Sequence, residues 1–268
     1  MIERLVVAYD GSDLGREAFA YALELARSAR VPVVAVCVLE PATSPMILAE
    51  PSAATASLDA PDPAFTHDEA SALLNELAAF AGRAGVELET RIERGEVIDR
   101  IARLASPGDL VAVGAKGRFA SGGFGSATRA LVERGPCPVL VAGGPLRDLS
   151  RVLAVYDWSR PARRAVEWAR GVAKQTGWPL TVLAVASDDA SIDGVLQKAQ
   201  DLAPEANVFS YAHEGASKAA QIEAAGAHTT HSVIAMGAYA DSWLHRLVFG
   251  ETTASVLRRL DAPLVLVR

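Results

Sequence analysis

The chain contains the same arrangement of apolar and polar residues twice. RLVVAYDGS (4–12) matches RVLAVYDWS (151–159), and Arg, Tyr, Asp and Ser recur in the same order. Near the end of each copy, GFGSATRALVERGPCPVLVAG (123–143) matches VFGETTASVLRRLDAPLVLVR (248–268) without a gap. A repeat of this length restricts the chain to folds that are built from two similar units.

In both copies, apolar runs alternate with amphipathic helical segments. In the first copy we expect strands at 4–9, 33–39, 86–92, 109–114 and 138–142 and helices near 13–29, 66–84, 95–105 and 126–134. In the second copy we expect strands at 151–156, 180–186, 206–212, 232–237 and 264–267 and helices near 161–176, 190–203, 215–228 and 251–260. This alternation is typical of parallel sheets that are covered by helices. The sequence therefore predicts an α/β fold of two tandem, doubly wound (Rossmann-like) domains, residues 1–145 and 149–268, each a five-stranded parallel sheet with helices on both faces.

The first copy also contains residues 41–65, which have no counterpart in the second copy. This stretch is rich in Pro, Ala and Ser and lacks a helical period. We expect a long, mobile loop there, and we hypothesise that it becomes ordered when a ligand binds.

Composition and charge exclude several classes of protein. Apolar residues make up 50% of the chain, but no apolar run reaches the roughly 18–20 residues of a membrane span. The net charge of −6 argues against a general nucleic-acid binder. The first residues lead directly into a strand without a secretion signal. Cys37 and Cys137 make no disulfide framework, so we expect a reduced, cytoplasmic setting.

Three segments of the first copy follow strands and are expected to meet at one edge of its sheet. These segments are 9–12, 38–40 and 114–126. The third segment contains glycines at 114, 117, 122, 123 and 125, which allow the backbone to approach a ligand closely.

The end of the glycine-rich segment has the features of an anion site. Ser126 begins a helix, whose free N–H groups and dipole attract negative charge. Lys116 and Arg118 add positive charge, and Asp10 can accept a hydrogen bond from an amine or a ribose hydroxyl. Two simpler interpretations stay open: the glycines can serve only as tight turns, and Asp10, which recurs as Asp157, can be a helix cap or turn residue.

These residues resemble those of a tandem universal stress protein. The resemblance rests on the Asp after the first strand, on G-x-x-G followed by a Gly-Ser pair at a helix start, and on a proline-led last strand, 138–142. It implies an ATP-binding regulatory protein of stress adaptation. Carried over to this chain, it implies that ribose and phosphates are held by Gly114, Gly117, Gly125 and Ser126, and adenine by Asp10 and Val38. One departure is that seven residues, 118–124, separate the glycines where the family pattern has nine.

The second copy keeps the spacing of nine but changes the residues. Ala240 stands where Gly117 stands, and Glu251 brings a carboxylate to the helix start, where it can replace a bound anion. We therefore expect a poor triphosphate site in the second half. The alternative is a different ligand, held by Asp157, Val185, Gly237 and Gly250.

Catalytic and metal motifs are weak. His228 and His231 have helix-face spacing for two metal ligands, but no Cys or close acidic residue supports them, and we expect no metal site. The G-x-S-x-G and Walker motifs are absent. The chain is therefore expected to be at most a weak ATPase.

The prediction is a regulatory protein that binds ATP, with ADP and AMP as alternatives and Mg²⁺ as a companion ion. The competing hypotheses are an interaction scaffold without nucleotide and a slow ATP hydrolase. The last strands, 138–142 and 264–267, are expected at sheet edges, where they would pair within one chain as a pseudo-dimer. Two chains could then pair as a homodimer, and the regulatory protein partners stay unnamed.

Overall fold

The protein is described by a computed structural model. The structure describes residues 1–40, 66–117, 125–186, 189–211, 221–222, 224–225, 232–238 and 262–268. The predicted loop 41–65, Arg118, Ala240, Gly250, Glu251 and the two histidines at 228 and 231 lie outside the described residues, as does most of the helices expected near 215–228 and 251–260.

The described elements of the first half follow the predicted order. They are β1 (Arg4–Ala8), α1 (Asp13–Ala29), β2 (Val33–Leu39), α2 (His67–Ala84), β3 (Leu88–Arg94), α3 (Val97–Leu104), β4 (Asp109–Gly114), α4 (Ser126–Arg134) and β5 (Val139–Ala142). The largest shift is in β3, which begins and ends two residues later than expected. The reason is that Val86 N still bonds to Ala81 O, as part of the end of α2.

The described elements of the second half repeat this order. They are β6 (Arg151–Tyr156), α5 (Arg160–Thr176), β7 (Leu180–Ala184), α6 (Asp189–Leu202), β8 (Asn207–Ser210), β9 (Ser232–Gly237) and β10 (Leu264–Val267). Local signals explain the ends of α5: Ser159 caps its first turn, and Gly177 closes it in the left-handed region with φ 76°.

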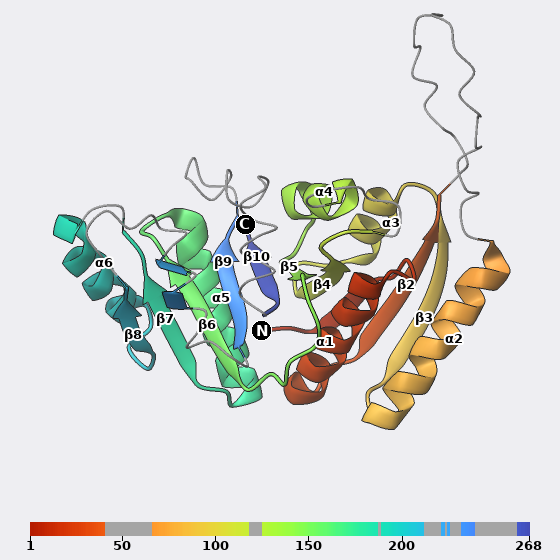
Figure 1. Cartoon of the computed structure of the whole chain (residues 1–268), viewed down its shortest axis with the longest axis horizontal. Coiled ribbons are helices and arrows are strands. Elements are labelled where there is room, and N and C mark those ends of the chain that lie inside the picture. The colour runs from red at the N-terminus through yellow and green to blue at the C-terminus, as the bar shows by residue number, and fades with distance from the viewer. Residues whose placement is uncertain are drawn as a thin grey trace, which may run out of the picture.

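All described strands form one ten-stranded sheet in the order β3-β2-β1-β4-β5-β10-β9-β6-β7-β8 (Figure 1). Within each half every neighbouring pair is parallel, so each half contributes the predicted five parallel strands. The two halves join where β10 pairs antiparallel with β5, with Val265 opposite Leu140. The last strands of the two copies therefore pair with each other, as expected, and each covers the other's edge.

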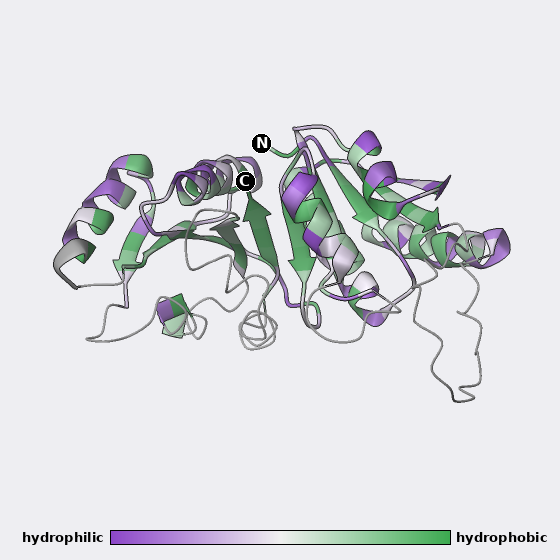
Figure 2. Ribbon diagram, turned by 90° about the horizontal axis from the view of Figure 1, so that it is seen from above, coloured by the Kyte–Doolittle hydropathy of each residue, from purple (hydrophilic) through white to green (hydrophobic). Residues whose placement is uncertain are grey.

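Helices cover both faces of the sheet, and alternate strand residues supply the two cores. Leu5 and Val7 belong to the core on the face covered by α1, α2, α5 and α6, whereas Val6 belongs to the core on the face covered by α3 and α4. Figure 2 shows the apolar strands between helices whose outward residues are polar. The inner strands, such as β2 and β4, read as nearly continuous apolar runs because they are buried on both faces, whereas the outermost strands β3 and β8 are partly exposed.

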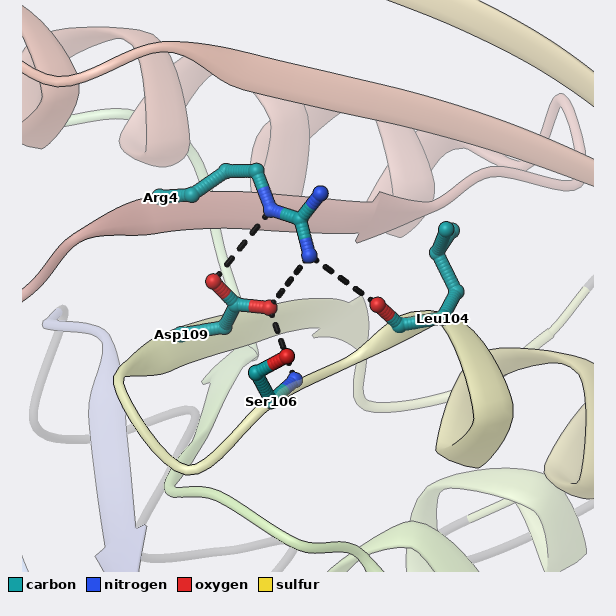
Figure 3. A network of polar contacts seen from close by, with 4 residues as sticks. All are labelled: Arg4, Leu104, Ser106 and Asp109. Carbon is teal, nitrogen blue, oxygen red and sulfur yellow. Dashed lines mark hydrogen bonds and ion pairs between the residues drawn. The ribbon is translucent and has the colours of Figure 1, made fainter.

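In the first half, a partly buried ion pair joins β1 and β4 at the end of the sheet where these strands begin (Figure 3). Arg4 Nη2 lies 2.6 Å from Asp109 Oδ2, and Arg4 Nη2 also donates to Leu104 O at 3.0 Å. Asp109, 4% exposed, further accepts a hydrogen bond from Ser106 N. The hydrogen bond with Asp109 raises the pKa of Arg4 above its ordinary value. This network joins β1, β4 and the end of α3.

Candidate functional site

The candidate site lies at the opposite edge, where the order of the strands reverses. β1 has β2 on one side and β4 on the other, so the strand order of the first half reverses at β1, which is its topological switch point. In doubly wound sheets ligands bind beyond the carboxyl ends of the strands at this point. Asp10, Val38 and Gly114 all lie at the carboxyl ends of these three strands.

Asp10 organises the turn from β1 into α1. Its Oδ1 accepts hydrogen bonds from Ser12 N at 3.0 Å and from Ser12 Oγ at 2.6 Å. Ser12 Oγ in turn accepts from Gly15 N at 3.0 Å and caps α1. One carboxylate oxygen is thus engaged in helix capping, which agrees with the simpler interpretation of Asp10 as a turn residue.

The second oxygen of Asp10 faces the glycine-rich segment. A Cβ added to Gly117 would lie 2.9 Å from Asp10 Oδ2, which is closer than such atoms normally approach. The structure therefore places Asp10 directly against Gly117, and only a residue without a side chain leaves the carboxylate where it is.

The two ends of the glycine-rich segment lie side by side. Gly125 N donates to Ala115 O at 2.9 Å. A Cβ on Gly125 would lie 3.5 Å from Gly117 N and 3.8 Å from Lys116 Cα. The backbone of 115–117 is therefore in contact with the start of α4, and the half-buried Lys116 stands beside it.

The first turn of α4 contains no acidic side chain of its own. Its N-cap, Gly125, makes no side-chain hydrogen bond. Within the described residues, the N–H groups of Ser126, Ala127 and Thr128 have no hydrogen-bond acceptor, and Ser126 is exposed. Free N–H groups and the positive end of the helix dipole make this turn able to bind an anion.

Gly114 has a packing role that the sequence analysis did not separate from ligand binding. It is buried, and an added Cβ would lie 2.8 Å from Leu14 C and 2.9 Å from Gly15 N. The end of β4 therefore touches the backbone of α1. Gly237 is similar, since its Cβ would lie 2.5 Å from Pro161 C in α5.

Val38 is the penultimate residue of β2, at the carboxyl end of that strand. It is half-buried and packs against the core beneath α3 and α4. Tyr9 N donates to Val36 O, which keeps the chain beside β2 just before Asp10. Beyond Val38, Glu40 Oε1 accepts from Val97 N at 3.5 Å, at the first residue of α3.

Thr128 belongs to this region and was missed by the sequence analysis. Its side chain is 4% exposed, and Oγ1 donates to Gly114 O at 3.0 Å. A signal was present, because this threonine recurs as Thr253 in the matched ends of the two copies.

The second half repeats the turn but with a different central residue. Asp157 Oδ1 accepts from Ser159 N at 3.1 Å, and Ser159 Oγ accepts from Ala162 N at 3.2 Å. Trp158 occupies the place of Gly11 and has φ 69°, in the left-handed region, with 57% of its surface exposed. Val185, the counterpart of Val38, is fully buried.

Nucleophilic and metal sites are weak throughout the described ranges. Burial raises the pKa of Cys37 and of Cys137 to about 11, so neither is a thiolate at neutral pH. Among the described side chains, no three His, Cys, Asp or Glu residues are grouped so that they could hold a metal ion. No helix in the described part of the chain has the length and hydropathy of a membrane span.

Comparisons with known proteins agree with this architecture. The universal stress protein family matches residues 1–143 and 149–268, so the chain belongs to that family. A universal stress protein of Synechocystis is 24% identical over 215 residues, which cover 75% of this chain and 73% of that protein. A universal stress protein structure from Archaeoglobus fulgidus has a TM-score of 0.71 at 20% identity and covers 99% of this chain and 98% of its own. A putative universal stress protein structure from Pseudomonas aeruginosa has a TM-score of 0.62 at 15% identity, with 99% and 93% covered.

Proposed function

We propose that the chain is a regulatory universal stress protein that binds ATP through its first half. The observation that carries this proposal is the start of α4. Its first N–H groups, which have no acceptor among the described residues, lie beside the backbone of 115–117, at the switch point of the sheet and within contact of the turn that Asp10 organises. Such a backbone arrangement favours a phosphate group.

The proposed roles follow the positions of the residues. Gly117, Gly125 and Ser126 would contact the phosphates through their backbone, and Lys116 and Arg118 would add positive charge. Asp10 Oδ2 and the backbone near Val38 would face the ribose and the adenine. Gly114 would act mainly by admitting α1 close to β4. Mg²⁺, if bound, would be held chiefly by the phosphates, since the described residues offer no metal cluster.

The second half would not bind ATP in the same way. Glu251 at the start of the corresponding helix and Ala240 in place of Gly117 argue against a triphosphate there. The described residues also contain no base poised to activate water, so hydrolysis would be slow. In this proposal the nucleotide acts as a regulatory ligand in the cytoplasm, and the β5–β10 pairing makes the chain a pseudo-dimer that can bind protein partners or a second chain.

Native mass spectrometry of the protein as purified, followed by calorimetric titration, tests the proposal. We expect one adenine nucleotide per chain, with ATP bound more tightly than AMP because the phosphates contact α4. GTP serves as the control that tests whether the site distinguishes adenine from guanine. A protein that purifies without nucleotide and gives no heat with ATP, ADP or AMP at millimolar concentration would favour the interaction scaffold instead.

A further inference from the structure

Thr128 makes a hydrogen bond that is unusual for its place in a helix. It is the third residue of α4, where a hydroxyl ordinarily faces its own helix or solvent. Here the side chain is buried, and Oγ1 donates across to the carbonyl of Gly114, the last residue of β4. The bond therefore joins the two elements that flank the glycine-rich segment.

The acceptor end of this bond is fixed. Gly114 packs so closely on Leu14 and Gly15 that even a Cβ would collide with their backbone. Its neighbour Ala115 donates to Ala142 O at 2.8 Å, which holds the strand end against β5. A group bonded to Gly114 O is thus bonded to a rigid part of the sheet.

The donor end lies in the turn whose N–H groups would meet the anion. Gly125 N bonds to Ala115 O, and Thr128 Oγ1 bonds to Gly114 O, so the first turn of α4 is attached to the strand at two points. Two bonds on successive carbonyls fix the rotation of the turn as well as its distance from the sheet. Without the hydroxyl, the bond from Gly125 N is the one of these two attachments that remains, and Gly114 O loses this buried donor.

We propose that Thr128 is a positioning residue that directs the N–H groups of residues 126–128 at the phosphate end of the nucleotide. This inference rests on the proposed function and concerns the same site. The Thr128 side chain bonds to the strand and not to the ligand, so its removal should appear in the affinity for phosphates and leave the affinity for the nucleoside nearly unchanged.

The decisive comparison is Thr128→Val against Thr128→Ser, because valine keeps the shape and removes the donor whereas serine keeps the donor. Calorimetry with ATP and with adenosine measures the two ends of the site separately. We expect Thr128→Val to weaken ATP binding by roughly tenfold and adenosine binding by less than threefold, and Thr128→Ser to restore ATP binding. Thr176→Val is the control, since it removes a half-buried hydroxyl that donates to Val172 O and accepts from Trp178 N, far from the site.

Equal losses for ATP and adenosine, or no loss for either, would overturn the inference. If Thr128→Val does not fold, as judged by its circular dichroism melt, Thr128→Ala and Thr128→Ser give the same contrast. Amide exchange at residues 126–128 in the nucleotide-free protein gives a second readout. It should be faster in Thr128→Val than in wild type, and unchanged rates would count against positioning. Absence of ATP binding by the wild-type protein would instead refute the proposed function, while the exchange experiment still tests the bond.

Discussion

The two halves of the molecule share the residues that build the sheet and differ in the residues that would meet a ligand. Asp10 and Ser12 recur as Asp157 and Ser159, with the same hydrogen bonds at the start of a helix. Gly114 and Gly237 both allow a strand end to touch a helix backbone. A feature that is kept in both halves therefore has a role in folding, and a feature found in one half is the better guide to binding.

At the end of the sheet where the strands begin, the two halves again share one residue and differ in another. Arg4 and Arg151 occupy equivalent places in β1 and β6. Asp109 lies opposite Arg4, whereas Ser232 lies opposite Arg151. At this pair of positions the first half therefore has an ion pair, whereas the second half has a serine opposite its arginine.

Transferring the carboxylate of the second half to the first should have the largest effect. Ser126→Glu places a negative charge at the start of α4, where the phosphates would lie. At about 4 Å and an effective dielectric near 20, this repulsion is roughly 4 kcal/mol, or about a thousandfold in affinity for ATP. Calorimetric titration measures the loss.

Ser126→Gln is the control for size, and it should weaken ATP binding far less than the glutamate. Equal losses in the two variants would mean that space, and not charge, limits the site. An unchanged affinity in Ser126→Glu would place the phosphates elsewhere.

Asp109→Ser, which copies Ser232, should destabilise the first half by about 3 kcal/mol, because it leaves the Arg4 guanidinium without its carboxylate. All four tryptophans lie in the second half. Urea unfolding followed by both circular dichroism and tryptophan fluorescence therefore distinguishes the half that loses stability.

Glu205→Ser, which breaks the exposed pair with Arg170, should change stability by less than about 1 kcal/mol. A similar cost in both variants would contradict the special role of the buried pair.

The order of the elements could be predicted because local signals repeat along the chain. Thr66 and Glu69 form the expected capping box, and Gly85 ends α2 with φ 67°. The proline-led last strands indicated sheet edges, and β5 does pair with β10. These features depend on neighbours in sequence or on one simple rule about edges.

The contacts between residues far apart in the chain could not be predicted from the sequence. Nothing in the pattern indicated that Gly114 is required by Leu14 and Gly15, or that Thr128 bonds to its carbonyl. The partner of Arg4 could not be chosen among the many acidic residues, because register across two strands decides it. Whether Gly117 and Ser126 hold a nucleotide stays a prediction.

Four glycine substitutions separate packing from binding. Gly114→Ala and Gly237→Ala should each reduce stability by about 2 kcal/mol, because the added methyl group meets backbone atoms that cannot move aside. Gly117→Ala meets only the Asp10 carboxylate, so it should weaken ATP binding with a smaller effect on unfolding. Gly82→Ala, in the open on α2, should be neutral or stabilising by up to about 1 kcal/mol. A stable Gly237→Ala protein would remove the argument that this glycine is kept for packing.

The smallest effect concerns the left-handed residue after each aspartate. Gly11 has φ 75° and Trp158 has φ 69°, so both turns require a backbone that favours glycine. Trp158 adopts this left-handed backbone, and its indole ring packs against Gly194. A Cβ added to Gly194 would lie 3.1 Å from the ring. Once the ring is removed, Trp158→Gly should be more stable than Trp158→Ala by about 1 kcal/mol, and Gly11→Ala should lose a similar amount. Thermal melts of the variants measure these differences. If alanine equalled glycine at 158, the turn of the second half could relax without strain, and the two halves would differ in backbone as well as in side chains.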